Sequence, residues 1–393
     1  MRPLRFFGIA ILWIVITLCL AITIVPRFLD AVYYRGQPSA HFDGARFFNP
    51  DGEDTFAATP GRGLGKGPGE TPNASLIARF ITGNDGRPAW PDHIPLHAVQ
   101  PPARVNGGDM IATWVGHATV LVQTQGFNIL TDPIWADTAG PLGIGPKRVT
   151  PPGIPFDKLP KIDVVLVSHD HYDHMDLDTL GKLWKRDHPR VITSLGNDSV
   201  IAQAGVPATA LDWGGRVRVG PGEVIVTRNH HWGSRWFADR NRALWSSFVV
   251  TLPGGNIFFA GDTGVGDYKW ADEAAAYGPV RLALIPIGAF RFSAGQMVAG
   301  SHIGPIDAAE IYARLHASTG IGVHWGTFRL SYEAHDTPPR MLREVVKCRG
   351  LHGFGTVYPG RPVRIAPYTP QPAAVPAWRA AACLDSPAIR TLP

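Results

Sequence analysis

The sequence predicts an α/β (α+β) fold in which β-sheets are covered by helices. Its 393 residues are 45% hydrophobic and 18% charged, a balance that excludes a disordered chain and a multi-span transporter. The 44 glycines and 36 prolines favour short elements separated by turns over a helical bundle. From Met110 onward, short apolar runs alternate with turns, first as apparent hairpins and then mixed with helix-like segments. This order is typical of sheets covered by helices rather than of a regular βαβ repeat.

Composition divides the chain into four parts. Residues 1–35 hold a long apolar run, and residues 36–105 form an irregular lead-in with a Gly-rich stretch at 61–70 that reads as a flexible loop. Residues 106–366 carry the strand-like and helix-like segments, and the Pro/Ala-rich tail at 367–393 is expected to be loose. The expected helices are 177–185, 305–316 and 338–348, and the expected strands include MIATWV, TVLVQT, FNILTD, DVVLVSH, VIVTRN, LWSSFVVTL, NIFFAGD, LALIPI and GIGVHW.

The N-terminal apolar run extends unbroken from Phe6 to Val25. Twenty helical residues cover about 30 Å, the thickness of the hydrocarbon core of a bilayer. Arg2 and Arg5 precede the run, and such charges are typical of an uncleaved signal anchor whose N-terminus stays in the cytoplasm. We therefore predict a single-pass transmembrane helix in residues 1–35, with the remaining chain on the periplasmic, or otherwise extracytoplasmic, side. A cleaved signal peptide is the alternative.

Charge and cysteine content narrow the range of partners. The net charge of +5 favours acidic partners, anionic lipid included. No strong basic cluster is present, which argues against a nucleic-acid partner. The three cysteines, Cys19, Cys348 and Cys383, are too few for a disulfide scaffold and form no CxxC pair. The sequence sets no oligomeric state, and a homodimer is compatible with it.

A loop rich in histidine and aspartate follows one of the expected strands. The strand VVLV runs directly into Ser168, and the next six residues contain His169, His171, Asp173 and His174. Imidazole and carboxylate are the ligands that zinc takes when no thiolate is available. Because sites in α/β folds tend to lie where strands end, this loop predicts a metal centre. His169 and His171 can reach one ion, whereas Asp173 and His174 would project toward a second.

Three further strand ends supply the ligands that would complete such a centre. Each is an apolar run that ends in a potential ligand beside a small or aromatic residue. A single histidine at a strand end is more often structural, but together with the first loop these residues fill two coordination shells. The candidates are His230 or His231 after VIVTR, Asp262 after NIFF, and His324 after GIG.

These residues resemble the metallo-β-lactamase fold superfamily, whose HxHxDH motif appears at residues 169–174. More narrowly, the chain is similar to the N-acylphosphatidylethanolamine-hydrolysing phospholipase D family and its bacterial relatives. The similarity covers about residues 105–365. It rests on TWVGHATVLV (113–122), LTDPIW (130–135), GPKR (145–148), SHDHYDH (168–174), HWGSRWFADRNRALWSSF (231–248), FFAGDTG (258–264), IPIGAF (285–290) and IGVHWGTF (321–328).

The resemblance implies an αββα sandwich with two zinc ions at one edge. One ion would be held by His169, His171 and His231, where the following Trp selects His231 over His230. The other would be held by Asp173, His174 and His324, and Asp262 would bridge the two together with a hydroxide. The metals would then be zinc, although iron or manganese can occupy sites of this kind.

Other residues have open roles. His302 resembles the histidine of a family H-x-x-P-x-x-A segment, which makes it a candidate acid or phosphate binder, or alternatively a helix cap. The loop before it, FRFSAGQMVAGS, is longer than in relatives. Asp170 has no assigned role. His117 and Asp132 are each expected either to orient a ligand or to serve the local backbone.

The function that these observations favour is a membrane-anchored dizinc phosphodiesterase of phospholipase D type, acting on an N-acylphosphatidylethanolamine-like phospholipid or another small phosphodiester. Asp262 and His302 are its candidate catalytic residues. The same metal site could instead serve a lactonase or β-lactamase-like acyl hydrolase. A third hypothesis is a non-catalytic envelope protein stabilised by zinc. It is disfavoured because an inactive relative would be expected to have lost at least one ligand, and all seven ligand positions are filled here.

Overall fold

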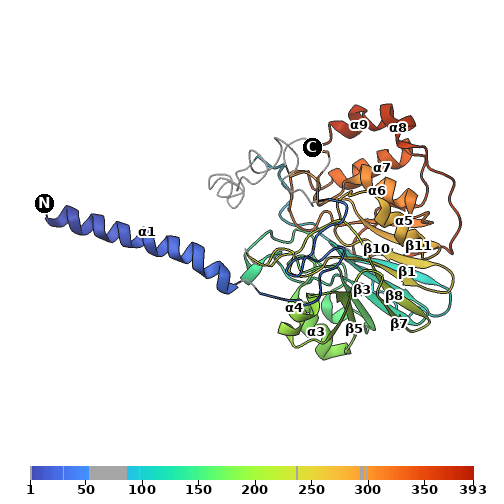
Figure 1. Cartoon of the computed structure of the whole chain (residues 1–393). Coiled ribbons are helices and arrows are strands. Elements are labelled where there is room, and N and C mark those ends of the chain that lie inside the picture. Colours follow the sequence, from blue (N-terminus) through green and yellow to red (C-terminus); the bar gives the residue numbers. More distant parts are fainter. Residues whose placement is uncertain are drawn as a thin grey trace.

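Two stacked sheets with helices on both outer faces form the body of the molecule in the computed structural model (Figure 1). The structure describes residues 2–29, 31–52, 86–96, 98–235, 238–292, 296–297 and 299–393, with side chains of the first helix described over residues 8–21. The Gly-rich stretch at 61–70 lies outside these residues. The layering confirms the predicted αββα sandwich of mixed α/β class.

The first sheet has the strand order β14-β1-β2-β3-β4-β5-β6. Strands β1, β2 and β3 form an antiparallel meander, whereas β3 to β6 run parallel. Helices α3 (Leu177–Asp187) and α4 (Asn197–Ile201) belong to the crossovers between the parallel strands. The strands are β1 (Met110–Gly116), β2 (Thr119–Thr124), β3 (Phe127–Thr131), β4 (Val164–Val167), β5 (Arg190–Ser194), β6 (Ala208–Leu211) and β14 (Pro362–Arg364).

The second sheet has the strand order β13-β12-β11-β10-β9-β8-β7. Strands β10, β11 and β12 are parallel to one another, and β8 and β10 are both antiparallel to β9. Strands β8, β10, β11 and β12 therefore all end at the same edge of this sheet. The strands are β7 (Arg216–Val219), β8 (Gly222–Thr227), β9 (Ser247–Thr251), β10 (Asn256–Phe259), β11 (Val280–Pro286), β12 (Thr319–Val323) and β13 (Phe354–Gly355).

Three hydrophobic clusters hold the layers together. Successive side chains of a strand point to opposite faces, so in β9 Phe248 and Val250 pack between the sheets while Val249 packs beneath the helices. The helices over the second sheet are α5 (Lys269–Ala275), α6 (Pro305–Arg314) and α7 (Thr337–Cys348). Helices α3 and α4 cover the first sheet with a separate cluster. The central strands of both sheets are thus buried on both faces, which explains why the sequence shows them as nearly continuous apolar runs.

The N-terminal helix α1 spans Arg2–Leu29 and projects away from the sandwich (Figure 1). The predicted single-pass transmembrane anchor in residues 1–35 is wrong. Among the residues that the structure describes, no helix is both long and apolar enough to cross a membrane. The predicted periplasmic, or otherwise extracytoplasmic, location of the remaining chain depended on this anchor and loses its support.

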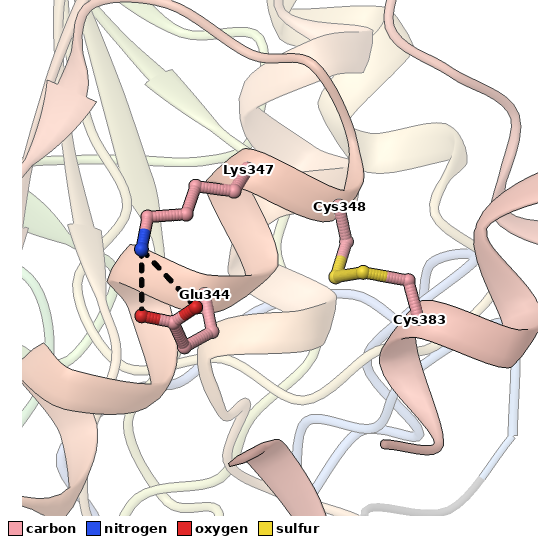
Figure 2. The surroundings of a disulfide bond; sticks show 4 residues. All are labelled: Glu344, Lys347, Cys348 and Cys383. Carbon is pink, nitrogen blue, oxygen red and sulfur yellow. Dashed lines mark hydrogen bonds and ion pairs between the residues drawn. A yellow bond between two sulfur atoms is a disulfide. The ribbon is translucent and has the colours of Figure 1, made fainter.

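The C-terminal tail differs from the expected loose segment. Helices α8 (Ala377–Leu384) and α9 (Pro387–Arg390) pack against α7, and Leu384 and Ile389 are buried there. A disulfide joins Cys348 at the end of α7 to Cys383 in α8 (Figure 2). The sequence did not reveal this pair, because two cysteines 35 residues apart carry no spacing signal.

We expect the double variant Cys348→Ser/Cys383→Ser to release the two C-terminal helices from α7. Closing a loop of this length stabilises a native fold by about 3–4 kcal/mol at most, because the cross-link restricts the unfolded chain. Limited proteolysis should therefore cut the variant between α7 and α9 well before it cuts the wild type. Cys19→Ser, which changes an exposed cysteine in α1, is the control. Equal resistance of the double variant and the wild type would contradict the prediction.

Candidate metal centre

Four loops from different strand ends meet at one edge of the sandwich. The loop at 168–174 follows β4 of the first sheet, and the segments at 228–232, 260–264 and 324–326 follow β8, β10 and β12 of the second. Because these ends of the second sheet share one edge, side chains far apart in the sequence converge there. Every predicted ligand is located in this convergence.

The first converging group contains His169, His171 and His231, whose ligand atoms all lie within 4.8 Å of one another. Nε2 of His169 lies 2.8 Å from Nδ1 of His171. The Nδ1 of His231 faces the backbone carbonyl of Ser301 at 2.8 Å, a contact that places the proton on Nδ1 and leaves Nε2 available as a ligand. His169 and His231 are fully buried.

The second group contains Asp173, His174 and His324, together with His117. Nε2 of His174 and Nε2 of His324 lie 3.2 Å apart, and each is 3.6 Å from the same Asp173 oxygen. His117 reaches that oxygen from the β1–β2 turn, at 2.9 Å. Its imidazole therefore lies where it can orient the Asp173 carboxylate, and burial lowers the pKa of His117 to about 3, so that the ring is neutral.

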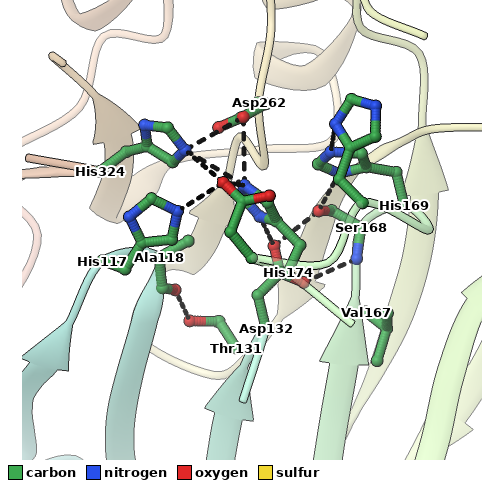
Figure 3. Close-up of polar contacts among 12 residues, drawn as sticks. His117, Ala118, Thr131, Asp132, Val167, Ser168, His169, His174, Asp262 and His324 are labelled. Atoms are coloured by element: carbon green, nitrogen blue, oxygen red, sulfur yellow. Dashed lines mark hydrogen bonds and ion pairs between the residues drawn. The ribbon is translucent and has the colours of Figure 1, made fainter. Parts of the chain in front are cut away.

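Asp262 lies between the two groups. One of its oxygens is 3.1 Å from Nε2 of His174 and 3.1 Å from Nε2 of His324. Asp262 also forms a ligand group with His231 and His302. Figure 3 shows its carboxylate facing both His324 and His174. A single carboxylate thus reaches residues of both groups, which is the position of a bridging ligand.

A buried carboxylate beneath the site holds the first loop in place. Asp132, just after β3, accepts hydrogen bonds from the backbone N–H and hydroxyl of Ser168, and it contacts Nδ1 of His174 at 2.6 Å. The Ser168 hydroxyl in turn lies 2.9 Å from Nδ1 of His169 (Figure 3). Outer contacts of this kind fix the ring orientation of metal-binding histidines. Of the two readings left open for Asp132, the structure favours ligand orientation.

The backbone is strained where these side chains are placed. His117, Asp132 and His324 all have positive φ, at 52°, 29° and 62°. Non-glycine residues adopt this region at a cost of order 1–3 kcal/mol each, and such positions persist where the surrounding fold enforces them. Three of them around one centre indicate that the fold sacrifices stability to direct these side chains.

Comparisons with known proteins agree with this geometry. Residues 127–325 match the Beta-lactamase superfamily domain. An N-acyl-phosphatidylethanolamine-hydrolyzing phospholipase D 1 from Caenorhabditis elegans is 34% identical over 270 residues, which cover 65% of this chain and 75% of that protein. The chain belongs to the metallo-β-lactamase superfamily. Within it, the chain resembles the N-acylphosphatidylethanolamine-hydrolysing phospholipase D relatives.

A metal-dependent hydrolase and a solved structure of a possible metal-dependent hydrolase are also similar to this chain. One from Anaeromyxobacter sp. (strain K) is 30% identical over 269 residues, covering 65% of this chain and 87% of that protein. A solved structure of a possible metal-dependent hydrolase from Veillonella parvula superposes with a TM-score of 0.53 at 14% identity, covering 65% of this chain and 99% of the other. The latter supports the fold alone. The chain is a metal-dependent hydrolase of the metallo-β-lactamase superfamily.

The charges and donors of the centre fit bound metal ions. Within the described part of the chain, Nε2 of His231 and Oδ1 of Asp262 are buried without hydrogen-bond partners, an arrangement that proteins avoid unless another group satisfies it. Burial alone would lower the pKa of His324, but the Asp262 and Asp173 carboxylates raise it to about 9. The carboxylates therefore demand positive charge, and a metal ion would supply it while the imidazole binds in its neutral form.

Three candidate residues lie at the edge of the centre or outside it. His302 is near it, with Nδ1 3.7 Å from Asp262 and the ring 5.2 Å from that of His231. Asp170 belongs to neither ligand group among the described residues, and burial raises its pKa to about 7. His230 turns away, because its Nδ1 contacts Asp51 at 2.9 Å. The geometry thus places His231, and not His230, among the converging candidate ligands.

Proposed function

We propose that this protein is a dizinc phosphodiesterase of phospholipase D type, which hydrolyses N-acylphosphatidylethanolamine-like phospholipids to phosphatidic acid and an N-acylethanolamine. The observation that carries the proposal is the position of Asp262 between two complete ligand groups. A phosphodiester is anionic, and a pair of adjacent cations suits its hydrolysis. The similarity to a phospholipase D of this substrate class supports the choice of substrate.

The candidate ligands form two metal-binding positions. His169, His171 and His231 would hold one ion, and Asp173, His174 and His324 the other, with Asp262 shared. Bound zinc would lower the pKa of water toward neutrality and offset the charge of the phosphoryl oxygens. The buried walls of the centre exclude bulk water, which strengthens the electrostatic contribution of each ligand to the transition state.

Hydrolysis forms a P–O bond from water and breaks the P–O bond to the ethanolamine oxygen. The departing alkoxide takes up the proton that the attacking water loses. His302 is the nearest candidate outside the ligand groups to contact the phosphate, since its side chain is 13% exposed and lies 3.7 Å from Asp262. Burial lowers the pKa of His302 to about 3, so we assign it the role of a neutral hydrogen-bond donor to the phosphate rather than that of a charged acid.

The test incubates the zinc-loaded full chain with N-acylphosphatidylethanolamine in mixed micelles and identifies the products by mass spectrometry. We expect phosphatidic acid and N-acylethanolamine in equal amounts. Fatty-acid release instead would establish an acyl hydrolase. The absence of any product from a folded protein that binds two ions would exclude the lipid as a substrate, and lactones would be tested next.

A further inference from the structure

A segment outside the superfamily match holds one of the ligand loops. Residues 31–52, here called the N-terminal strap, precede the matched region at 127–325 and lie against the sandwich. The strap folds on itself through the bridges Ser39–Phe42 and Phe42–Phe47. It is irregular, as expected for the lead-in, yet it is bound to the body through buried contacts.

Aromatic side chains anchor the strap. Phe42 and Phe47 are fully buried in a small cluster with Leu244 and Trp245, the residues that lead into β9. The backbone N–H of Phe47 donates to the carbonyl of Asn241 at 2.8 Å. Burial of the two phenylalanines stabilises this docking and helps to keep the polar residues that follow in fixed positions.

Asn49 joins the strap to a ligand residue directly. Its side-chain amide donates to the backbone carbonyl of His231 at 2.8 Å, and its Oδ1 accepts from Nε1 of Trp245 at 3.0 Å. The side chain is buried, with only 7% of the residue exposed. The carbonyl of His231 is thereby tied to a tryptophan that itself belongs to the core.

Asp51 holds the preceding residue. One carboxylate oxygen lies 2.9 Å from Nδ1 of His230, and the other accepts from the backbone N–H of Asp267 at 3.0 Å. Arg228, also in the loop after β8, lies 3.4 Å from the same carboxylate. The neighbouring turn approaches closely, since a side chain at Gly266 would come within 2.3 Å of Asp51. Asp51 thus joins two loops at the metal-bearing edge.

His231 is the residue of the first group that comes from the second sheet. His169 and His171 come from one loop and share its backbone, whereas His231 lies in the loop after β8. Its ring is fixed by Ser301, and its backbone carbonyl accepts from Asn49. The preceding His230 contacts Asp51 through its ring, and its backbone bonds to Thr263 and Gly264. The strap therefore adds to the contacts that hold this loop, and it supplies the bond to the carbonyl of the third candidate ligand of the first ion.

We propose that Asn49 and Asp51 are positioning residues that set His231 for metal binding, an inference that rests on the metal centre of the proposed function. Through these two residues the strap supports the metal centre, although it lies more than 100 residues before the ligand loop in the sequence. Contacts behind a ligand typically change metal affinity by about 10- to 100-fold. We expect a loss of this size at one of the two ions only.

The experiment compares full-length Asn49→Ala and Asp51→Asn with the wild type in two measurements. The first is amide hydrogen exchange over residues 229–232 in metal-free protein, which should be faster in both variants. The second is zinc competition against a chromophoric chelator, in which one of two dissociation constants should rise about 10- to 100-fold. The d–d spectrum of the cobalt-loaded variants should change in parallel.

Asp43→Asn is the matched control, because Asp43 is an exposed carboxylate of the same strap that accepts from the backbone N–H groups of Ala45 and Arg46 and contacts neither His230 nor His231. It should leave the exchange at 229–232, both zinc affinities and the cobalt spectrum as in the wild type. Unchanged exchange and unchanged affinities in Asn49→Ala would overturn the inference, as would an equal loss of affinity in Asp43→Asn. If exchange is faster in the two variants but the wild type itself does not bind two ions, the proposed metal centre is refuted and the positioning contact stands.

Discussion

Replacing Asp262 by Asn is expected to lower kcat by about 10³-fold or more. The change keeps the shape of the side chain but removes a charge that lies 3.1 Å from His174 and His324 of the second group and within 4.8 Å of His231 of the first. A factor of 10³ corresponds to about 4 kcal/mol of transition-state stabilisation, the size expected when a charged group between two catalytic ions is lost. Initial rates on a phosphodiester substrate, together with the metal content of the purified variant, check the prediction.

Asp307→Asn is the matched control for that experiment. Asp307 is also a buried carboxylate, but it lies in α6, receives a hydrogen bond from Tyr268, and belongs to no ligand group among the described residues. Its variant should retain activity within a few-fold and its full metal content. If both Asn variants lost activity to a similar extent, the effect would reflect a buried charge in general and not the bridging position of Asp262.

Removing the metal ions with a chelator is expected to abolish activity while the sandwich stays folded. The three hydrophobic clusters contain none of the ligand residues, so the core survives metal loss. Ligand binding at 1,000 times the dissociation constant stabilises a fold by about 4 kcal/mol, and the melting temperature should fall accordingly. Circular dichroism and initial rates, measured on the same sample, separate the two effects.

The control for this second prediction is to add metal back to the chelator-treated protein. Zinc should restore both activity and melting temperature, and parallel additions of manganese and iron(II) would rank the metals that the donor set accepts. Unfolding on chelation would point instead to a structural role for the ions. Full activity in a protein shown to be metal-free would contradict a metal-dependent mechanism altogether.

Much of the sandwich could be predicted because its elements carry local signals. The expected helix at 338–348 is found at Thr337–Cys348, and the strand VVLV is β4. The convergence of the candidate ligands could also be predicted, because a strand end followed by His or Asp is visible in the sequence. The choice between His230 and His231 depended on resemblance, and the structure explains it through the contact of His230 with Asp51.

What the sequence did not reveal depends on contacts between distant residues. Asn49 and Asp51 look like ordinary loop residues, and only the fold brings them to the loop after β8. The pairing of Cys348 with Cys383 and the docking of α8 and α9 likewise follow from packing on α7. The predicted N-terminal anchor is wrong, because among the described residues no helix is both long and apolar enough to cross a membrane.

The separation of the ligands along the chain has a consequence for how the protein is made. His174 and His324 are 150 positions apart, and Asn49 lies 182 positions from the loop it supports. Contacts of such long range form late in folding, since chain-closure entropy must be overcome first. A ribosome-bound chain that has not yet emerged past β12 has no complete second ligand group. Metal uptake should therefore follow the docking of the two sheets, and ion binding would report the end of folding rather than initiate it.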